Sequence, residues 1–293
     1  MGTMQQSFLK TGDKLMYNVV FLILNYNSYD ELMACVKSIR KKCNNYYIVV
    51  VDNASKEDEI IKLNKLCEES EDLLLIKNKK NLGFARGNNV GFRYIKKNIK
   101  CKYIAMINSD TEIIENGFEE ELDKAFEKYK FAVLGPDILP AHSNPMINEP
   151  NTLEKVIKEI SRTKTIIKII KIPIVNILYL VFNRLRNKFL VKKNTRVNEI
   201  CVDCELHGSF LVFSSLFVLD GLCDDTFLYG EEDILAKDCR DNKLRLLYYP
   251  IIKILHSESG STKKTVPDLI ERKLFFLNNR LDSLNVLLKK YNQ

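Results

Sequence analysis

The sequence predicts an α/β protein with a mostly parallel central sheet and helices on both faces of that sheet. Apolar runs of strand length alternate with helical patterns along the first half of the chain, and four consecutive runs end in polar or acidic residues. Continuous apolar strands joined by helices are typical of a parallel sheet that is covered on both sides. The chain of 293 residues is long enough for one large domain of this class with an appendage.

The first predicted strand, residues 17–24, stops at a polar triplet, residues 25–27. Ser28 follows directly and is expected to cap a helix, with Glu31 three residues later completing a capping box. The chain therefore begins its regular structure with a strand and a helix.

Four further strands continue this alternation, and three of them end in polar or acidic residues as the first one does. These strands are predicted at residues 46–53, 73–76, 101–108 and 131–135. Helices are predicted at residues 56–69, from residue 84 or 85 onward, through residues 118–126, and as an amphipathic C-terminal helix at residues 266–291. The C-terminal helix is expected to pack on its own domain or on a second subunit, as in a homodimer.

Most of the positive charge lies in one segment. Residues 155–196 hold twelve Lys and Arg against one acid, whereas the whole chain has a net charge of +7. Residues 172–183 carry no charge but are too few to cross a bilayer, for which about 20 apolar residues are needed. Two structures fit this pattern equally: an element lying on an anionic membrane surface, or a helical hairpin broken at Pro173 with its lysines in water. Nucleic acid is not the expected partner, because the basic residues alternate with aliphatic side chains and not with stacking aromatics.

The N-terminal residues lack the apolar core of a signal peptide, which predicts a cytoplasmic protein with reduced cysteines. Cys201 and Cys204 form a single C-x-x-C pair, and no second pair or spaced histidines follow to complete a zinc site. Small buried residues are therefore the preferred interpretation of these two cysteines, over a metal-binding or redox role.

Two acids, Asp52 and Asp110, end two strands of the predicted sheet. Each alone could cap the next helix, but ligands of such sheets bind where the carboxyl ends of the strands meet. The predicted site fits a nucleoside diphosphate. Asp52 could bind the base, the Gly- and Asn-rich loop with Arg86 could bind phosphate, and Asp110 could hold a cation. Mg²⁺ or Mn²⁺ suits a site that is poor in carboxylates and borrows phosphate oxygens.

Several motifs resemble those of a known enzyme family. The stretches NYNSYDELMACVKSI, VVVDNASKE, NLGFARGNNVG and MINSDTEI resemble, in order and spacing, the donor-binding half of family 2 inverting glycosyltransferases of GT-A fold. The stretches FLYGEEDILAKDCRDNKLRLLYYP and HSESGST resemble the acceptor side of the same family. The similarity covers most of residues 17–139 and 205–262, and is greatest to the rhamnosyltransferase-like bacterial polysaccharide branch.

The resemblance implies a role for each matching residue. Glu232 takes the place of the catalytic base, with Asp233 one position further on as the alternative. Asp110 and His256 take the places of the metal ligands, and Asn108 stands where the family's motif has its first Asp. The donor contacts are expected at Asn25, Tyr26, Asn27, Asp52, Asn81, Gly83, Arg86, Asn108, Ser109 and Asp110. The acceptor contacts are expected at His207, Gly208 and Glu231.

The resemblance also implies an organisation and a function. The chain is expected to divide into five parts: an N-terminal extension at 1–16, a nucleotide-sugar-binding half at 17–140, a basic amphipathic insertion at 141–200, an acceptor and catalytic half at 201–262, and a C-terminal helix at 263–293. The expected reaction moves a sugar from a UDP- or dTDP-sugar to a hydroxyl of a growing, lipid-linked cell-surface polysaccharide such as a capsule. The expected location is the inner face of the cell membrane, with the protein bound peripherally.

Other function classes remain as alternatives. A nucleotidyltransferase or a nicotinamide-dependent dehydrogenase should carry a Gly-rich phosphate loop directly after the first strand, where this chain has residues 25–27 instead. A catalytically silent membrane-surface module with the same fold is the third alternative, because a fold alone does not prove activity. The acids at 110 and 231–233, together with His256, favour an enzyme.

Overall fold

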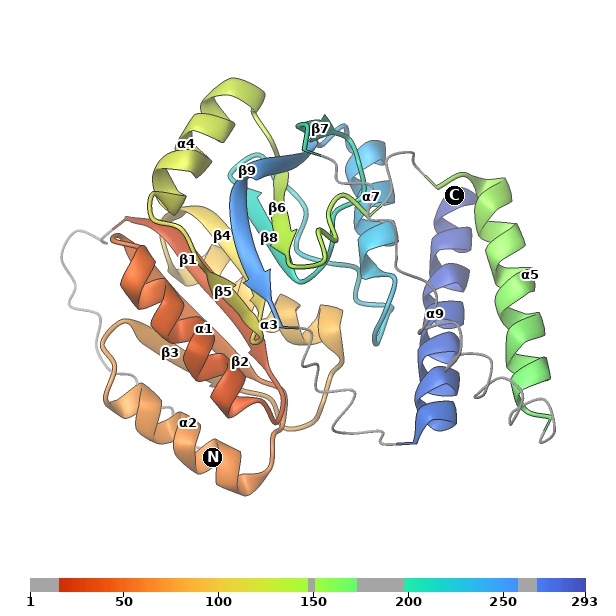
Figure 1. Ribbon diagram of the computed structural model, residues 1–293, viewed down its shortest axis with the longest axis horizontal. Helices are drawn as coiled ribbons and strands as arrows, with labels where there is room; N and C mark the ends of the chain where they lie inside the picture. Colours follow the sequence, from red (N-terminus) through yellow and green to blue (C-terminus); the bar gives the residue numbers. More distant parts are fainter. Residues whose placement is uncertain (1–15, 147–150, 173–197, 258–267) are drawn as a thin grey trace.

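The computed structural model describes residues 16–146, 151–172, 198–257 and 268–293. These residues form one central sheet with helices on both faces, and a pair of long helices stands at one end of it (Figure 1). Residues 1–15 of the N-terminal extension and most of the uncharged segment at 172–183 lie outside the described residues. Within the described parts, no helix combines the length and the apolar character needed to span a bilayer.

The sheet has the strand order β3-β2-β1-β4-β8-β6-β9-β5, and β7 pairs with β9. Its strands are β1 Tyr17–Asn25, β2 Tyr46–Asp52, β3 Leu73–Lys77, β4 Cys101–Asn108, β5 Thr111–Ile113, β6 Val133–Leu139, β7 Cys201–Val202, β8 Phe210–Ser214 and β9 Leu246–His256. The first four strands are parallel, and β6 is parallel to β9. β8 lies antiparallel between β4 and β6 and joins these two groups of strands. The mostly parallel α/β fold is thus confirmed.

Seven helices are present in the described residues. They are α1 Tyr29–Lys42, α2 Glu57–Glu68, α3 Phe84–Asn98, α4 Phe118–Tyr129, α5 Leu153–Ile170, α7 Glu231–Asp241 and α9 Leu269–Tyr291. The middle residues of the central strands, such as 19–23 of β1 and 48–51 of β2, are apolar and buried, as expected for a sheet that is covered on both sides. In β1, Phe21 and Ile23 face the core under α1, α2 and α4, whereas Leu22 faces the core under α3 and α7.

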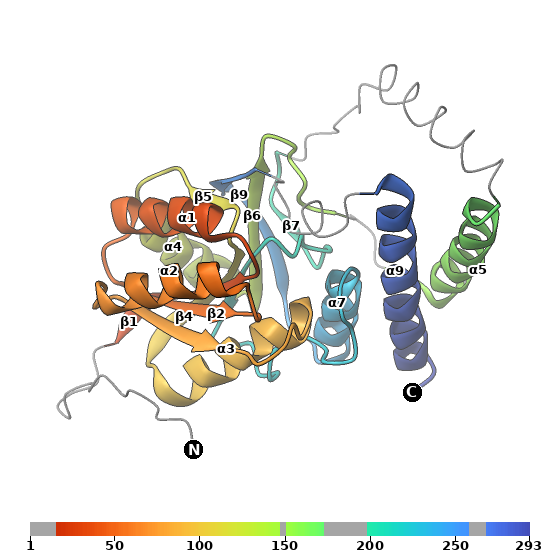
Figure 2. The ribbon, with the colours of Figure 1, turned by 90° about the horizontal axis from the view of Figure 1, so that it is seen from below.

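The pair α5 and α9 packs side by side beyond α7 (Figure 2). Val156 and Ile160 of α5 pack with Ile234 of α7 and with Leu284 and Leu287 of α9 in one small apolar cluster. The basic insertion therefore contains a helix that is attached to the body, and its exposed face carries the lysines. The predicted C-terminal helix corresponds to α9, which begins with Asp268 accepting hydrogen bonds from the backbone N–H groups of residues 270 and 271.

Two local details differ from the sequence-based predictions. Ser28 stands at the N-terminus of α1, but its hydroxyl makes no capping bond to that helix and donates instead to Asn25 Oδ1, 3.0 Å away. The predicted capping bond of Ser28 is therefore wrong. The first free N–H of the helix, that of Tyr29, donates to Glu59 Oε2 at 2.8 Å. In addition, the acidic stretch after β4 forms the short strand β5 before α4 begins.

Candidate active site

The carboxyl ends of β2, β1 and β4 are joined by side-chain hydrogen bonds. Asn25 and Asp52 are register partners in adjacent strands, and Asn25 Nδ2 donates to Asp52 Oδ1 at 3.0 Å. Ser28 donates to Asn25, and its hydroxyl also lies 3.0 Å from that of Ser109, the residue before Asp110. A continuous polar row thus runs along the edge of the sheet where ligands of parallel α/β folds bind.

Asp52 is fully buried, with 0% of its surface exposed. Its carboxylate accepts hydrogen bonds from Asn25, from the Ser55 backbone N–H at 3.0 Å and from the Ser55 hydroxyl at 2.6 Å. Ser55 Oγ also accepts from the backbone N–H of Asn27, whose φ of 51° lies in the left-handed region. Asp52 therefore holds the 25–27 turn in its shape. Tyr26 lies in this turn and is partly exposed.

The Gly- and Asn-rich loop is held to the end of β2 by Asn53, a residue that was not selected from the sequence. Asn53 Nδ2 donates to Asn81 Oδ1 at 2.9 Å and to the Gly83 carbonyl at 3.1 Å, and Asn53 Oδ1 accepts from the backbone N–H of Leu82. Gly83 has φ of +82°, and a Cβ there would lie 2.2 Å from the carbonyl oxygen of Phe227. Only glycine fits at this contact between the Gly- and Asn-rich loop and the backbone at Phe227.

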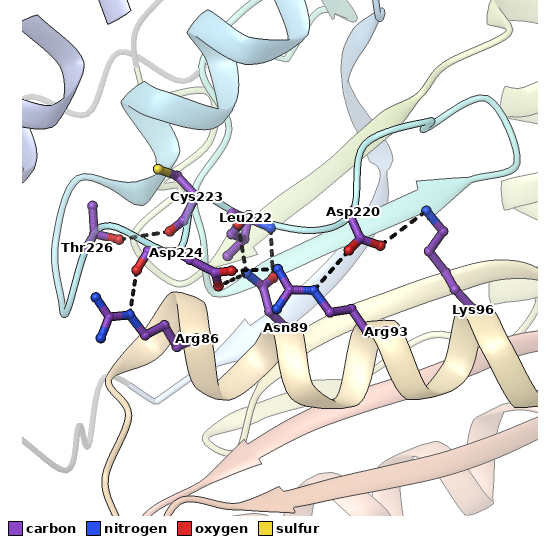
Figure 3. A network of polar contacts seen from close by, with 9 residues as sticks. All are labelled: Arg86, Asn89, Arg93, Lys96, Asp220, Leu222, Cys223, Asp224 and Thr226. Carbon is purple, nitrogen blue, oxygen red and sulfur yellow. Dashed lines mark hydrogen bonds and ion pairs between the residues drawn. The ribbon is translucent and has the colours of Figure 1, made fainter. Parts of the chain in front are cut away.

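Arg86 is placed apart from the acids. In the first turn of α3, its Nε donates to the Asp224 carbonyl at 2.5 Å (Figure 3). Among the described residues, none of its hydrogen bonds or ion pairs reaches Asp52, Asp110 or Glu232. The sequence placed Arg86 with those three acids, and the structure shows it holding the loop that precedes α7. Its contact with donor phosphate stays a prediction.

The same loop is held to α3 by a second set of contacts (Figure 3). Asn89 Nδ2 donates to Asp224 Oδ1 at 2.7 Å, and Arg93 forms ion pairs with Asp224 and Asp220 at 2.6 and 3.0 Å. Burial alone would raise the pKa of Asp224, but the hydrogen bonds from Arg93 and Asn89 outweigh it and lower that pKa. The loop leading to α7 is thereby fixed to α3.

Asp110 and His256 form a close pair at the end of β4. Thr111 in β5 pairs with His256 in β9, and this pairing brings His256 Nε2 to 3.1 Å from Asp110 Oδ1. The His256 side chain is only 11% exposed and that of Asp110 only 9%, so water screens the interaction between them little. One carboxylate oxygen and one imidazole nitrogen that face each other suit a divalent cation that takes its other ligands from a substrate.

His207, Gly208 and Ser209 connect this pair to α7. Asn108 N–H donates to the Ser209 carbonyl at 2.9 Å, and the His207 ring lies 5.9 Å from the His256 ring, centroid to centroid. Gly208 N–H donates to Glu232 Oε1 at 3.2 Å. The segment 207–209 therefore places Glu232 on the same side of the sheet as Asp110. Asn144, also missed from the sequence, holds this segment by accepting the His207 N–H at 2.6 Å.

The three acids that open α7 have different surroundings. Glu232 is partly exposed, whereas Glu231 and Asp233 are each 4% exposed. Burial, and then the charge of Glu232, raise the pKa of Glu231 to about 7. Asp233 points away from Gly208 and forms an ion pair with Arg280. Of the three, Glu232 is the one whose carboxylate lies at the predicted acceptor segment.

The structure therefore brings together most of the residues selected from the sequence. The residues joined along one edge of the sheet are Asn25, Asn27, Asp52, Asn108, Ser109, Asp110, His207, Gly208, Glu232 and His256. Asn81 and Gly83 lie next to this row in the loop held by Asn53. Arg86 and Asp233 contact Asp224 and Arg280 instead, and Glu231 is buried beside Glu232. Among the residues with coordinates described here, no three His, Cys, Asp or Glu form a complete metal-binding cluster, and Cys204 is buried.

The solved structures with a similar fold include glycosyltransferases of GT-A fold. The fold is similar to that of GalNAc-T7 with UDP, GalNAc and Mn²⁺, with a TM-score of 0.55 and 14% identity over 82% of this chain and 43% of that one. It is also similar to mannosyltransferase PcManGT from Pyrobaculum calidifontis in complex with GDP-Man and Mn²⁺, with a TM-score of 0.51 and 12% identity over 95% of this chain and 74% of that one. At these identities the likeness shows the fold, and the predicted GT-A class is confirmed.

The sequence profile of Glycosyl transferase family 2 matches residues 20–171, which is more than half of the chain. The protein belongs to this family, as predicted. A curated relative, the low-salt glycan biosynthesis hexosyltransferase Agl10 of Haloferax volcanii, is 26% identical over 145 residues, covering 50% of this chain and 44% of Agl10. The chain thus matches less than half the length of that relative. The rhamnosyltransferase-like branch stays a prediction.

Proposed function

We propose that this protein is an inverting glycosyltransferase that moves a hexosyl or rhamnosyl group from a UDP- or dTDP-sugar to a hydroxyl of a growing glycan. The observation that carries this proposal is the connected row from Asp52 through Asp110 and His256 to Glu232. The residues proposed to bind the donor, to bind a cation and to act as the base are connected along one edge of one sheet. Membership of Glycosyl transferase family 2 supports the same chemistry.

The donor is proposed to bind across the ends of β1 and β2. Asp52 is proposed to accept a hydrogen bond from the imino N–H of a pyrimidine. It lies beneath the 25–27 turn with none of its surface exposed, so the base reaches it only if that turn shifts. The N-terminus of α3 begins at Phe84, after the loop held by Asn53, and a helix N-terminus favours phosphate. UDP in GalNAc-T7, GDP-Man in PcManGT and the hexosyltransferase name of Agl10 support a nucleotide-linked hexose as donor.

A divalent cation is proposed to bind at Asp110 and His256. The two side chains offer one hard oxygen and one nitrogen ligand 3.1 Å apart, which fits Mn²⁺ or Mg²⁺ completed by diphosphate oxygens. Asn108, in place of a second acid, leaves the site with one carboxylate, so the diphosphate has to supply the rest of the charge. When bound, such a cation neutralises charge on the departing nucleoside diphosphate.

Glu232 is proposed as the catalytic base. The acceptor hydroxyl gives its proton to the Glu232 carboxylate as its oxygen bonds to the anomeric carbon, and the bond from that carbon to the diphosphate breaks in the same step. The Gly208 N–H holds Oε1 of Glu232, which leaves the other oxygen for the hydroxyl. Asp233 is not suited to this role because it is buried and paired with Arg280.

The acceptor is proposed to be a lipid-linked oligosaccharide of a cell-surface polysaccharide, such as a capsule, with the protein bound peripherally at the inner face of the membrane. The outer face of α5 carries basic side chains together with exposed Ile157 and Ile169, which suits an anionic headgroup layer. A hollow of about 400 Å³ between α5 and α9 is lined by Lys158, Arg162 and Phe276, among others. If charge reversal of Lys164, Lys168 and Lys171 left binding to anionic vesicles unchanged, the membrane part of the proposal would be wrong.

The experiment that tests the reaction measures release of nucleoside diphosphate from a panel of nucleotide sugars, with and without Mn²⁺. We expect the wild type to turn over at least one UDP- or dTDP-sugar, and Glu232→Gln to lose that activity while donor still raises its melting temperature. Glu120→Gln is the matched control, because Glu120 is an exposed acid in the first turn of α4. Binding without turnover by the wild type across the panel and a set of glycan acceptors would favour the silent module instead.

A further inference from the structure

Arg280, in the middle of α9, makes contacts that the proposed reaction does not yet explain. Its Nη1 donates a hydrogen bond to Asp233 Oδ2 in an ion pair. Its Nη2 and Nε lie 3.0 and 3.1 Å from Glu159 Oε1 of α5. The Arg280 side chain is 18% exposed and that of Asp233 only 6%. A guanidinium that is bound at both ends and shielded from water defines one geometry for its partners.

Asp233 is also held from the opposite side. Asn151 Nδ2 donates to Asp233 Oδ1 at 3.0 Å and to Glu205 Oε1 at 2.9 Å, and Tyr291 of α9 donates to the Asn151 carbonyl. Asp233 is therefore fixed by α9 and by the residue that precedes α5, next to the connection between β7 and β8. Both ribbon views place α9 beside α7 (Figures 1 and 2).

The charges of this cluster are arranged around Arg280. Burial, and then the charge of Asp233, raise the pKa of Glu205 to about 8, so Glu205 holds a proton near neutral pH. Asp233 keeps its ion pair with Arg280 in a site where an unpaired carboxylate would be costly. Removing Arg280 would leave Asp233 buried without its cation, in the residue directly after Glu232.

The start of α7 has no spare room against α9. Gly230, just before the helix, has φ of +97°, and a Cβ there would lie 2.6 Å from Arg280 Nη1 and 3.0 Å from the Cβ of Ser283. Consecutive residues of a helix point about 100° apart. Fixing Asp233 toward α9 therefore also fixes the direction of Glu232, toward Gly208.

We propose that Arg280 is a positioning residue for the transfer reaction, acting through Asp233 to hold the carboxylate of Glu232 at the Gly208 N–H. This inference rests on the proposed role of Glu232 as base. Packing alone does not account for it, because Ile234, Leu284 and Leu287 already bury the apolar contact between α7 and α9. Arg280 adds direction to that contact.

The test compares Arg280→Met, which keeps the aliphatic length, with Arg280→Lys, which keeps the charge but loses the planar fork. Turnover is expressed per nucleotide-binding site, counted by titration with the donor nucleotide, so that misfolded protein does not count. We expect Arg280→Met to lower kcat at least 10-fold with nucleotide affinity unchanged within twofold, and Arg280→Lys to recover part of that loss. Lys289→Gln, which removes an exposed cation of the same helix, should leave kcat unchanged.

A second comparison separates positioning from a general loss of structure. In a Glu232→Gln background, Arg280→Met should lower the residual rate no further, because residues that act through one group are not additive. Wild-type kcat per site in Arg280→Met, or an equal loss in both backgrounds, would overturn the inference. If Arg280→Met does not fold, Asp233→Asn takes its place with the same expectations. An inactive wild type refutes the proposed function itself, whereas an active wild type with active Arg280→Met refutes only the positioning role.

Discussion

The contact between Gly208 and Glu232 makes a sharp prediction. A Cβ at position 208 would lie 2.6 Å from Glu232 Oε1, 3.2 Å from Cδ and 3.3 Å from Cγ. The atoms in the way are the end of a flexible side chain, so the carboxylate and not the backbone should move. Gly208→Ala is therefore expected to fold normally and to displace the base.

The size of the effect follows from these distances. Ordinary contact between a Cβ and a neighbouring atom begins near 3.4 Å, so Oε1 has to retreat from 2.6 Å to at least that separation. A misplacement of about 1 Å costs about 100-fold in rate, and complete loss of a general base costs up to about 10⁴-fold. We expect kcat to fall about 100-fold, which corresponds to about 2.7 kcal/mol of activation free energy. The free energy of unfolding should change by less than about 1 kcal/mol.

The assay is nucleoside diphosphate release at saturating donor, with unfolding followed by circular dichroism on the same samples. In a Glu232→Gln background, Gly208→Ala should cost less than about threefold further, because the group that it displaces is already inactive. A Gly208→Ala variant with kcat within threefold of the wild type, beside an inactive Glu232→Gln, would refute the reasoning. Equal losses in both backgrounds would also contradict it.

Three further predictions concern Glu205, which lies beside Asp233 of α7, and Asp52 and Asp110 at the strand ends. Glu205→Gln should flatten the pH dependence of the free energy of unfolding, measured with urea. Because the pKa of Glu205 is raised from 4.5 to about 8 in the fold, the folded wild type binds more protons than the unfolded chain between these pH values. The wild type therefore loses up to about 1 kcal/mol of stability per pH unit as the pH rises through this range. Asp52→Asn should lower the free energy of unfolding by about 1–3 kcal/mol, since an amide nitrogen would then face the Ser55 donors, and thermal shift should show weaker binding of pyrimidine nucleotides. Asp110→Asn should abolish the extra rise in melting temperature that Mn²⁺ gives in the presence of nucleoside diphosphate, whereas an unchanged rise would place the cation elsewhere.

The first half of the fold is predictable because its signals are local. Each parallel strand is an apolar run with a helix pattern after it, and the structure has β1, β2, β3 and β4 in those places. β8 is harder to place, because nothing local states that residues 210–214 lie between β4 and β6, more than seventy residues earlier in the chain. The predicted Ser28 cap fails because the hydroxyl donates to Asn25, three residues earlier, and also lies 3.0 Å from the Ser109 hydroxyl, a contact that only the fold creates.

The residues of the candidate site also differ in how well the sequence alone predicts them. Asp52, Asp110 and Glu232 follow from strand ends and from motif spacing, both of which are visible in the chain. Arg280 is not visible in this way, since it is one basic residue among many in an amphipathic helix, and only packing brings it to Asp233. Asn53 had a usable signal, because it directly follows the last residue of a buried strand.

The position of β8 also determines how the chain can be dissected. The two ranges predicted to bind donor and acceptor, 17–140 and 201–262, contribute strands to one sheet, because β8 lies between β4 and β6. A fragment ending near residue 140 would leave β5 and β6 without a strand partner and one edge of β4 unpaired, and such edges promote aggregation. During synthesis, β4 and β6 can join one sheet only after residues 210–214 have been made. We therefore expect that a nucleotide-binding fragment will be recovered only when the later half is supplied as a second polypeptide.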